Sequence, residues 1–197
     1  MNQKEKIIEV TTKLIIESKG DLSLVTARKI AEKADASLGL INYHFENKDK
    51  LITECVQRII YKEIRAFVPK DTVYSDDEYE ADRQRLTFWA KQVFEFFYGN
   101  KSISKVSILG DLQNNMPKSN LVDMQRGLLL ALTADVDNQK KNMLVFSLTS
   151  IMEAAFLQES AVSERLGYEL SKPNERERFI DDTIDGIIGF YMKKTDG

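Results

Sequence analysis

The stretch TARKIAEKADASLGLINYHFENKDKL, from Thr26 to Leu51, decides the fold of the first part of this chain. Thr26 and Ser37 are good helix N-caps, because each side-chain oxygen can accept a hydrogen bond from an amide of the first helical turn. Val25 and Ile30 flank the first cap and form a hydrophobic staple. Two short helices are therefore expected, one beginning after each cap.

A short interruption separates these two helices. Asp35 and Ala36 end the narrow apolar stripe of the first helix, which is formed by Ile30, Ala31 and Ala34. Aspartate tolerates a left-handed turn better than most residues, so a tight turn is expected at this point. The stretch predicts a helix-turn-helix unit, whose second helix lies in the major groove of DNA.

This region resembles the tetracycline-repressor (TetR) family of bacterial transcription regulators. The matching residues are Gly20, Thr26, Ile30, Ala31, Ser37, Gly39, Ile41, Tyr43, His44, Phe45, Lys48 and Leu51. Two positions depart from the family pattern: Asp35 stands where the family usually has glycine, and Asn42 where it often has a tyrosine that reaches a phosphate. Asparagine can bond either a phosphate or an adenine edge.

The resemblance implies an all-α protein with two parts. Residues 1–46 would form a three-helix DNA-binding domain, and residues 47–197 a helical domain for ligand binding and dimerisation, with 47–68 as a connecting helix. The 3.6-residue apolar period supports this, since it continues through almost every segment between turn signals. It predicts about nine helices in all, the last three spanning about 120–136, 139–166 and 173–193.

Composition fits a small regulator. The 197 residues are 43% hydrophobic and 30% charged, and no apolar run reaches the ~20 residues that cross a bilayer. The net charge of −3 is unevenly divided: residues 1–70 hold 13 Lys/Arg against 10 Asp/Glu, and the remainder 15 against 21. The basic excess around the helix-turn-helix favours a DNA partner. With no signal peptide recognised, the expected location is the bacterial cytoplasm.

The DNA contacts are expected from residues around the second short helix. Ile41 and Phe45 have the spacing of core residues, which leaves Leu38, Gly39 and Leu40 near the exposed side, where thymine methyl groups can cover the leucines. Lys48 is placed to meet a phosphate at the start of the next helix. The full set of expected DNA-binding residues is Thr26, Arg28, Ser37, Leu38, Gly39, Leu40, Asn42, Tyr43 and Lys48. The alternative for either leucine is packing on the preceding helix.

No catalytic set, phosphate loop or metal-ligand cluster is recognisable, so neither an enzyme nor a cofactor or metal site is expected. His44 is the only histidine, and by resemblance it is a packing and orienting residue beside Phe45. Cys55 is the only cysteine and lies on an apolar helical stripe. It is therefore expected to be a small buried side chain rather than a redox sensor.

The second domain is expected to bind a small molecule and to form a homodimer through the last two long helices. Its predicted pocket residues are Phe88, Trp89, Phe97, Met124, Phe146 and Met152. Because no charged residue is recognisable in that interior, the expected effector is apolar or amphipathic. The predicted dimer residues are Ala154, Ala155, Ile184, Gly186, Ile187, Gly189 and Tyr191. The alternative function is a helical interaction module that is regulated by a protein partner.

Overall fold

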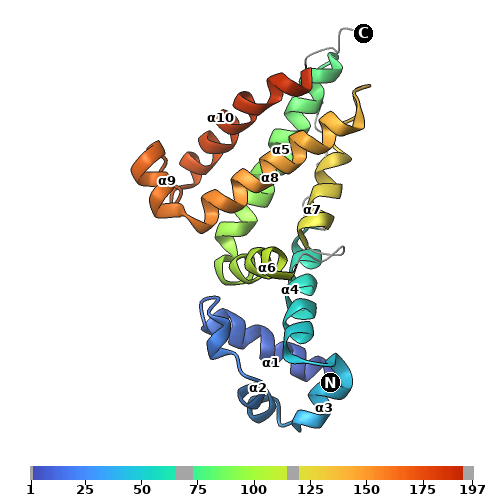
Figure 1. Cartoon of the computed structure of the whole chain (residues 1–197), viewed down its shortest axis with the longest axis vertical. Helices are drawn as coiled ribbons and strands as arrows, with labels where there is room; N and C mark the ends of the chain where they lie inside the picture. The colour runs from blue at the N-terminus through green and yellow to red at the C-terminus, as the bar shows by residue number, and fades with distance from the viewer. Residues whose placement is uncertain (1, 65–72, 115–119, 193–197) are drawn as a thin grey trace. The chain divides into compact units, whose positions relative to one another are not determined.

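The structure, a computed structural model, describes residues 2–64, 73–114 and 120–192, without the side chains of residues 60–64, 113 and 114. Over these residues the chain is all-helical and forms no strand, as predicted (Figure 1). The ten α-helices are α1 (Gln3–Glu17), α2 (Ala27–Ala34), α3 (Leu38–Phe45), α4 (Lys48–Ile64), α5 (Glu78–Gly99), α6 (Lys101–Asn114), α7 (Asn120–Leu129), α8 (Asn138–Leu157), α9 (Glu159–Leu166) and α10 (Pro173–Met192). One turn of 3-10 helix, Leu22–Leu24, precedes α2.

Contacts between the helices define two compact units. The N-terminal unit contains α1 to α4 together with α6, and the C-terminal unit contains α5 and α7 to α10. The functional division proposed from the sequence, 1–46 against 47–197 with 47–68 as a connector, stays a prediction. No helix in the parts of the chain described here is long and apolar enough to cross a membrane.

The N-terminal unit is built on one apolar core. The inner face of α1 is formed by five buried residues at helical spacing: Ile7, Ile8, Thr11, Leu14 and Ile15. Cys55 is also fully buried in this core, which confirms it as a packing residue. Gly20 has a φ of +81°, and a Cβ there would lie 3.0 Å from the carbonyl oxygen of Ser102 in α6. Glycine is therefore required where the end of α1 meets α6.

Two helix boundaries in the C-terminal unit correct the sequence-based expectation. The helix expected to reach residue 136 ends at Leu129, because the backbone amides of Thr133 and Ala134 donate to the carboxylate of Asp82 instead of continuing the helix. The helix expected over 139–166 is two helices, α8 and α9. They are separated at Gln158, whose φ and ψ of −115° and 35° interrupt the helical backbone.

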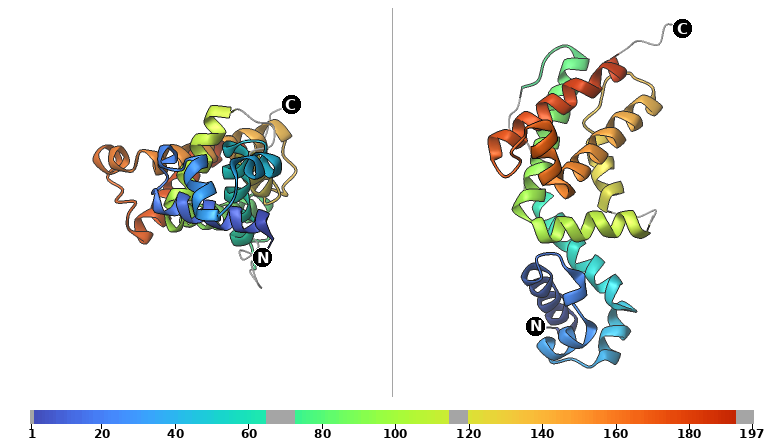
Figure 2. Two further views of the ribbon diagram at one scale, coloured as in Figure 1. Left: turned by 90° about the horizontal axis from the view of Figure 1, so that it is seen from below. Right: turned by 60° about the vertical axis from the view of Figure 1, so that its left-hand side comes forward.

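The C-terminal unit packs α5, α8 and α10 against one another (Figures 1 and 2). The rings of Phe94 on α5 and Phe179 on α10 stack with their centroids 5.6 Å apart, and Phe97 packs against Phe156 of α8 at 5.5 Å. These aromatic contacts join the three longest helices of the unit and form the centre of its core.

The interior of this unit also contains charge, so the expectation of an uncharged interior is wrong. Asp82, Glu153 and Arg176 are buried. Asp82 accepts hydrogen bonds from the Thr133 and Ala134 amides at 2.8 and 3.0 Å, and from the side chains of Arg85 and Tyr191. Burial alone would raise the pKa of the Asp82 carboxyl, but these donors outweigh it and hold that pKa below its usual value.

Arg176 forms a second buried polar cluster. Its guanidinium makes a bidentate pair with Glu95, at 2.6 and 2.7 Å, and donates to the backbone carbonyls of Leu170 and Ser171. The same guanidinium carbon lies 4.6 Å from the ring centroid of Tyr98. This cluster fixes the loop before α10 to α5, and each of its charges has a partner.

Candidate nucleic-acid interface

The two caps predicted from the sequence are both present. The Thr26 hydroxyl accepts from the amide of Lys29 at 3.2 Å, and the Ser37 hydroxyl accepts from the amide of Leu40 at 3.1 Å. Asp35 occupies the left-handed region between the two helices, with φ 51° and ψ 54°, as expected. Residues 27–45 therefore form the predicted helix, tight turn and helix.

The second of these helices, α3, presents one face to the core and one to solvent. Ile41 and Phe45 are buried, as predicted. Leu38 is 44% exposed and Tyr43 is 81% exposed, and Gly39 and Asn42 lie on the same open side, with Leu40 half-buried. An exposed leucine followed by glycine at the start of a helix leaves an apolar, closely approachable surface.

Basic side chains lie in the first turns of the two helices that flank α3 in the chain. Arg28, in the first turn of α2, is exposed. Lys48 opens α4 and is half-buried, and its ammonium lies 3.9 Å from the carboxylate of the exposed Asp49. This is a loose pair, in which a phosphate can take the place of the carboxylate. The Asn47 side chain accepts from the amide of Lys50 at 2.9 Å and caps α4.

His44 lies in an aromatic row at the end of α3. Its ring meets Tyr43 edge-on at 5.2 Å and Phe45 at 6.0 Å between centroids, and the side chain is half-buried. This placement is compatible with the orienting role that the resemblance implies. Among the residues that the structure describes, no group of His, Cys, Asp and Glu is arranged to hold a metal ion.

Comparison with known proteins agrees with this geometry. Residues 7–55 match the family model of the bacterial regulatory proteins, tetR family. The matched part of the N-terminal unit is similar to a tetR-family DNA-binding domain. Its helix-turn-helix, α2 and α3, lies wholly inside the matched residues. A DNA-binding transcriptional regulator is the function that this domain supports.

Solved structures extend the likeness to the fold of the whole chain. A TetR-like transcriptional regulator from Rhodococcus sp. RHA1 is 16% identical over 97% of each chain, with a TM-score of 0.57. A second transcriptional regulator from Rhodococcus sp. Rha1 is 14% identical over 95% of this chain and 97% of its own, also at 0.57. A TetR variant from Acinetobacter baumannii AYE, solved in complex with minocycline, is 11% identical over 95% and 97%, with a TM-score of 0.59. No curated protein matches the chain.

The predicted ligand-pocket residues do not all face inward. Phe97 and Met152 are buried, and Phe88, Trp89 and Met124 are half-buried. Phe146 is 58% exposed on the outer side of α8, so it is not available to line an interior cavity. The remaining five residues stay a predicted lining for an apolar site.

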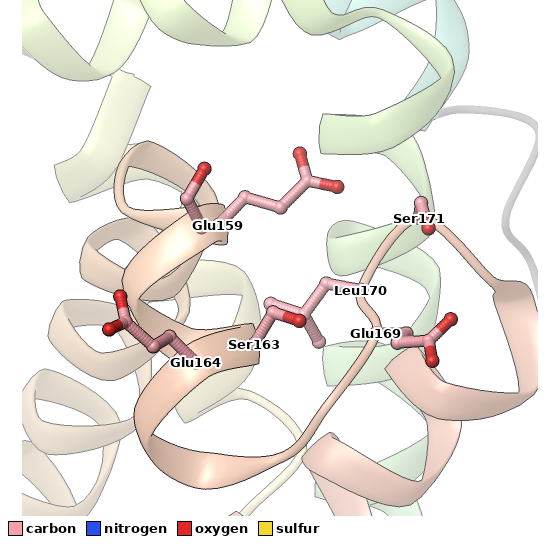
Figure 3. Close-up of a pocket in the computed structure, with 7 residues that line it drawn as sticks. Glu159, Ser163, Glu164, Glu169, Leu170 and Ser171 are labelled. Carbon is pink, nitrogen blue, oxygen red and sulfur yellow. The ribbon is translucent and has the colours of Figure 1, made fainter.

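A different pocket, which sequence reasoning missed, lies between α9 and the chain that follows it (Figure 3). It has a volume of about 500 Å³ and is lined by Glu159, Ser160, Ser163, Glu164, Glu169, Leu170 and Ser171. This lining is polar and acidic, unlike the apolar interior that was expected. Gly167 has a left-handed conformation, ends α9 and turns the chain back beside that helix. This glycine was the sequence signal from which the end of α9 could have been predicted.

The predicted dimer residues divide into two groups. Ala155, Ile184 and Tyr191 are buried inside the C-terminal unit itself, so they have almost no surface left for a partner subunit. Ala154, Gly186 and Gly189 are exposed, and Ile187 is half-buried. Sequence reasoning missed three larger exposed apolar side chains on the same two helices, Met143, Phe146 and Phe190, which are each at least 50% exposed.

Proposed function

We propose that this protein is a dimeric repressor that binds a palindromic operator in the bacterial cytoplasm and is released by a small-molecule effector. The outward face of α3 carries the proposal. Leu38 and Tyr43 are exposed although they are large and partly apolar, while Ile41 and Phe45 anchor the helix from the other side. An exposed face of this kind is suited to contact with another molecule, and the major groove of DNA is wide enough to admit one helix.

Each residue of the predicted DNA-binding set has a proposed partner on the duplex. Leu38 and Leu40 meet thymine methyl groups, and Gly39 allows the backbone to approach the base edges. Asn42 bonds a phosphate or an adenine edge, and Tyr43 meets a phosphate. The residues that complete the phosphate contacts are Thr26, Arg28, Ser37 and Lys48.

The dimer is proposed to form through the outer faces of α8 and α10. Phe146 and Phe190 are 58% and 55% exposed, and the Lys140 ammonium lies 5.9 Å from the Phe190 ring centroid. The apolar end of α10 therefore lies beside the first turn of α8. At Gly186 and Gly189 no atom other than those of the neighbouring residues of α10 lies within 4 Å of the position that a Cβ would take, so a partner helix has room to approach closely.

The effector site is proposed beside α5, where Trp89 and Phe97 lie, and next to Met152 of α8. Apolar cavities between packed helices are a common kind of ligand site, and the TetR variant from Acinetobacter baumannii was solved with minocycline. A ligand that prefers one spacing of the two reading helices would shift the dimer away from its DNA-binding state.

Trp89 is the only tryptophan and reports this site directly. An amphipathic effector is expected to change its emission, to raise the thermal stability and to release DNA over one concentration range. Stabilisation without release of DNA would contradict the coupling. Extraction of small molecules that copurify with the protein supplies the first compounds to test.

The DNA-binding function is tested by selecting duplexes from a random-sequence library with the full-length protein. The expected product contains two inverted half-sites whose centres are ~34–36 Å apart, about one turn of duplex. Failure to enrich any duplex, with folded protein confirmed by circular dichroism, would overturn the proposed function.

A further inference from the structure

The first turn of α1 contacts the turn that precedes the reading helix and the last residue of that helix. The side-chain amide of Gln3 donates to the carbonyl oxygens of Ala34 and Asp35, at 3.3 and 3.0 Å, in the turn that precedes α3. The ammonium of Lys4 lies 5.3 Å from the ring centroid of Phe45, the last residue of α3. Two neighbouring residues of α1 thus contact the turn before α3 and the end of α3.

The turn beside Gln3 adopts a conformation that its own residue does not favour. Asp35 is left-handed, with φ 51°, at a position where glycine is the usual residue of a helix C-terminus. The amides of this turn are satisfied within the backbone, since Ala36 donates to the carbonyl of Ala31 at 2.9 Å. The carbonyls of Ala34 and Asp35 lie past the last helical bond, and Gln3 supplies a donor to both of them.

The reading helix has few anchors of its own. It is eight residues long, and of these only Ile41 and Phe45 are buried. Its direction therefore depends strongly on the turn that precedes it. Gln3 belongs to the more firmly fixed α1, which buries five residues of its own in the core of the unit.

We propose that Gln3 is a positioning residue for DNA binding, which holds the left-handed turn at Asp35 and through it the direction of α3. This inference rests on the proposed DNA-binding function. Gln3 acts on the protein and not on the duplex. Removing its side chain lowers the fraction of molecules whose α3 is correctly placed. The apparent affinity for DNA falls in proportion to this fraction.

The proposal is tested by comparing the cost of Gln3→Ala in two backgrounds. Asp35→Gly and Asp35→Asn both remove the aspartate charge, but glycine favours the left-handed conformation more than asparagine does. With a duplex selected by the unaltered protein, Gln3→Ala is expected to weaken binding by about tenfold in the Asp35→Asn background. In the Asp35→Gly background the loss should be at most about threefold.

An equal loss in both backgrounds would mean that Gln3 contacts the duplex itself, and no loss would mean that the turn does not need it. Either result would overturn the proposal. The slope of log affinity against log salt is expected to stay the same, because no charge that meets a phosphate has been removed.

Amide hydrogen exchange in the free protein tests the same contact without DNA. In Gln3→Ala, the amides of Asp35 and Ala36 are expected to exchange about tenfold faster, while that of Ile15 in α1 keeps its rate. Glu9→Ala, an exposed change in the same helix, is the matched control and should alter none of them. Uniform acceleration through the unit would assign Gln3 to general stability and overturn the proposal. This measurement decides the inference even if the chain selects no duplex.

Discussion

Different kinds of interaction stabilise the interiors of the two units of this protein. In the N-terminal unit the described side chains that are buried are apolar, apart from the hydroxyl residues Thr11 and Ser104, and its ion pairs lie at the surface. The C-terminal unit buries two charged clusters, around Asp82 and Arg176, that join residues far apart in the sequence.

This difference has a physical consequence for tolerance to change. A surface ion pair contributes little to the unfolding free energy. Truncating a buried apolar side chain lowers that free energy by an amount that grows with the volume removed. A buried carboxylate with several donors behaves otherwise, because removing it leaves each of those donors without a partner. The C-terminal unit is therefore expected to respond most sharply to single polar substitutions, and the N-terminal unit to changes in its caps and apolar core.

The largest effect is expected from Asp82→Ala, which leaves the Thr133 and Ala134 amides and the Tyr191 hydroxyl without their acceptor. The C-terminal unit should lose ~3–5 kcal/mol of unfolding free energy. Urea unfolding followed by Trp89 fluorescence measures it, since Trp89 lies in the same unit on α5. The matched control is Asp185→Ala, which breaks an exposed pair with Arg83 at 2.9 Å and should cost about 1 kcal/mol or less. Equal costs would contradict the contrast between buried and exposed charge.

The pH dependence of stability sharpens the same contrast. The pKa of Asp82 is lowered in the folded protein, so its contribution is present above the unfolded pKa of about 4 and is lost as the pH falls through the folded value. The difference in unfolding free energy between the unaltered protein and Asp82→Asn is therefore expected to shrink below about pH 4. A difference that grew on acidification would mean that the folded pKa is raised instead.

A medium effect is expected from Gly189→Leu on α10. Nothing lies within 4 Å of the position that a Cβ would take, so the single subunit has room for leucine and the helix gains propensity. The added bulk should instead weaken the proposed dimer by ~1–3 kcal/mol, about five- to 150-fold in its dissociation constant. Sedimentation equilibrium measures this change. Gly127→Leu on α7, where a Cβ also meets nothing, is the control, and a fully dimeric Gly189→Leu would place this glycine outside the interface.

The smallest effect is expected from the caps of the N-terminal unit. Thr26→Ala removes the acceptor for the Lys29 amide and should cost about 1 kcal/mol of stability in the absence of DNA. Thr53→Ala is the matched control, because its hydroxyl donates to the carbonyl of Asp49 inside α4 and caps nothing. Two measurements compare the variants: the thermal unfolding temperature and the hydrogen-exchange rate of the Ile30 amide. An equal response would show that the cap contributes nothing specific to α2.

The same difference between the units explains what could be predicted from the sequence. The caps at Thr26, Ser37 and Asn47, the turn at Asp35 and the buried face of α1 depend on residues within a few positions of one another, and all are present. Such signals can be read along the chain. The all-helical fold follows from the same periodicity.

The errors arose where distant residues decide the local structure. The amide of Ala134 is 52 residues from Asp82, and that bond ends the helix expected to reach residue 136. Tyr191 fits an apolar stripe that a partner helix could cover, but its hydroxyl donates to Asp82, 109 residues away, inside its own unit. Neither pairing has a local signal, so helix periodicity alone could not predict that Ala134 lies outside a helix or that Tyr191 is buried in its own unit.

The central claim, that α3 reads DNA with its outward face, is tested most directly by comparing Lys48→Ala and Leu38→Ala on a panel of duplexes around the selected one. Lys48→Ala is expected to weaken all duplexes alike and to reduce the salt slope by about one unit. Leu38→Ala should leave the slope unchanged and alter the preference among sequences by ~1–3 kcal/mol at most, chiefly at thymine positions. Unchanged affinity and preference in both variants would contradict the claim that α3 is the reading helix.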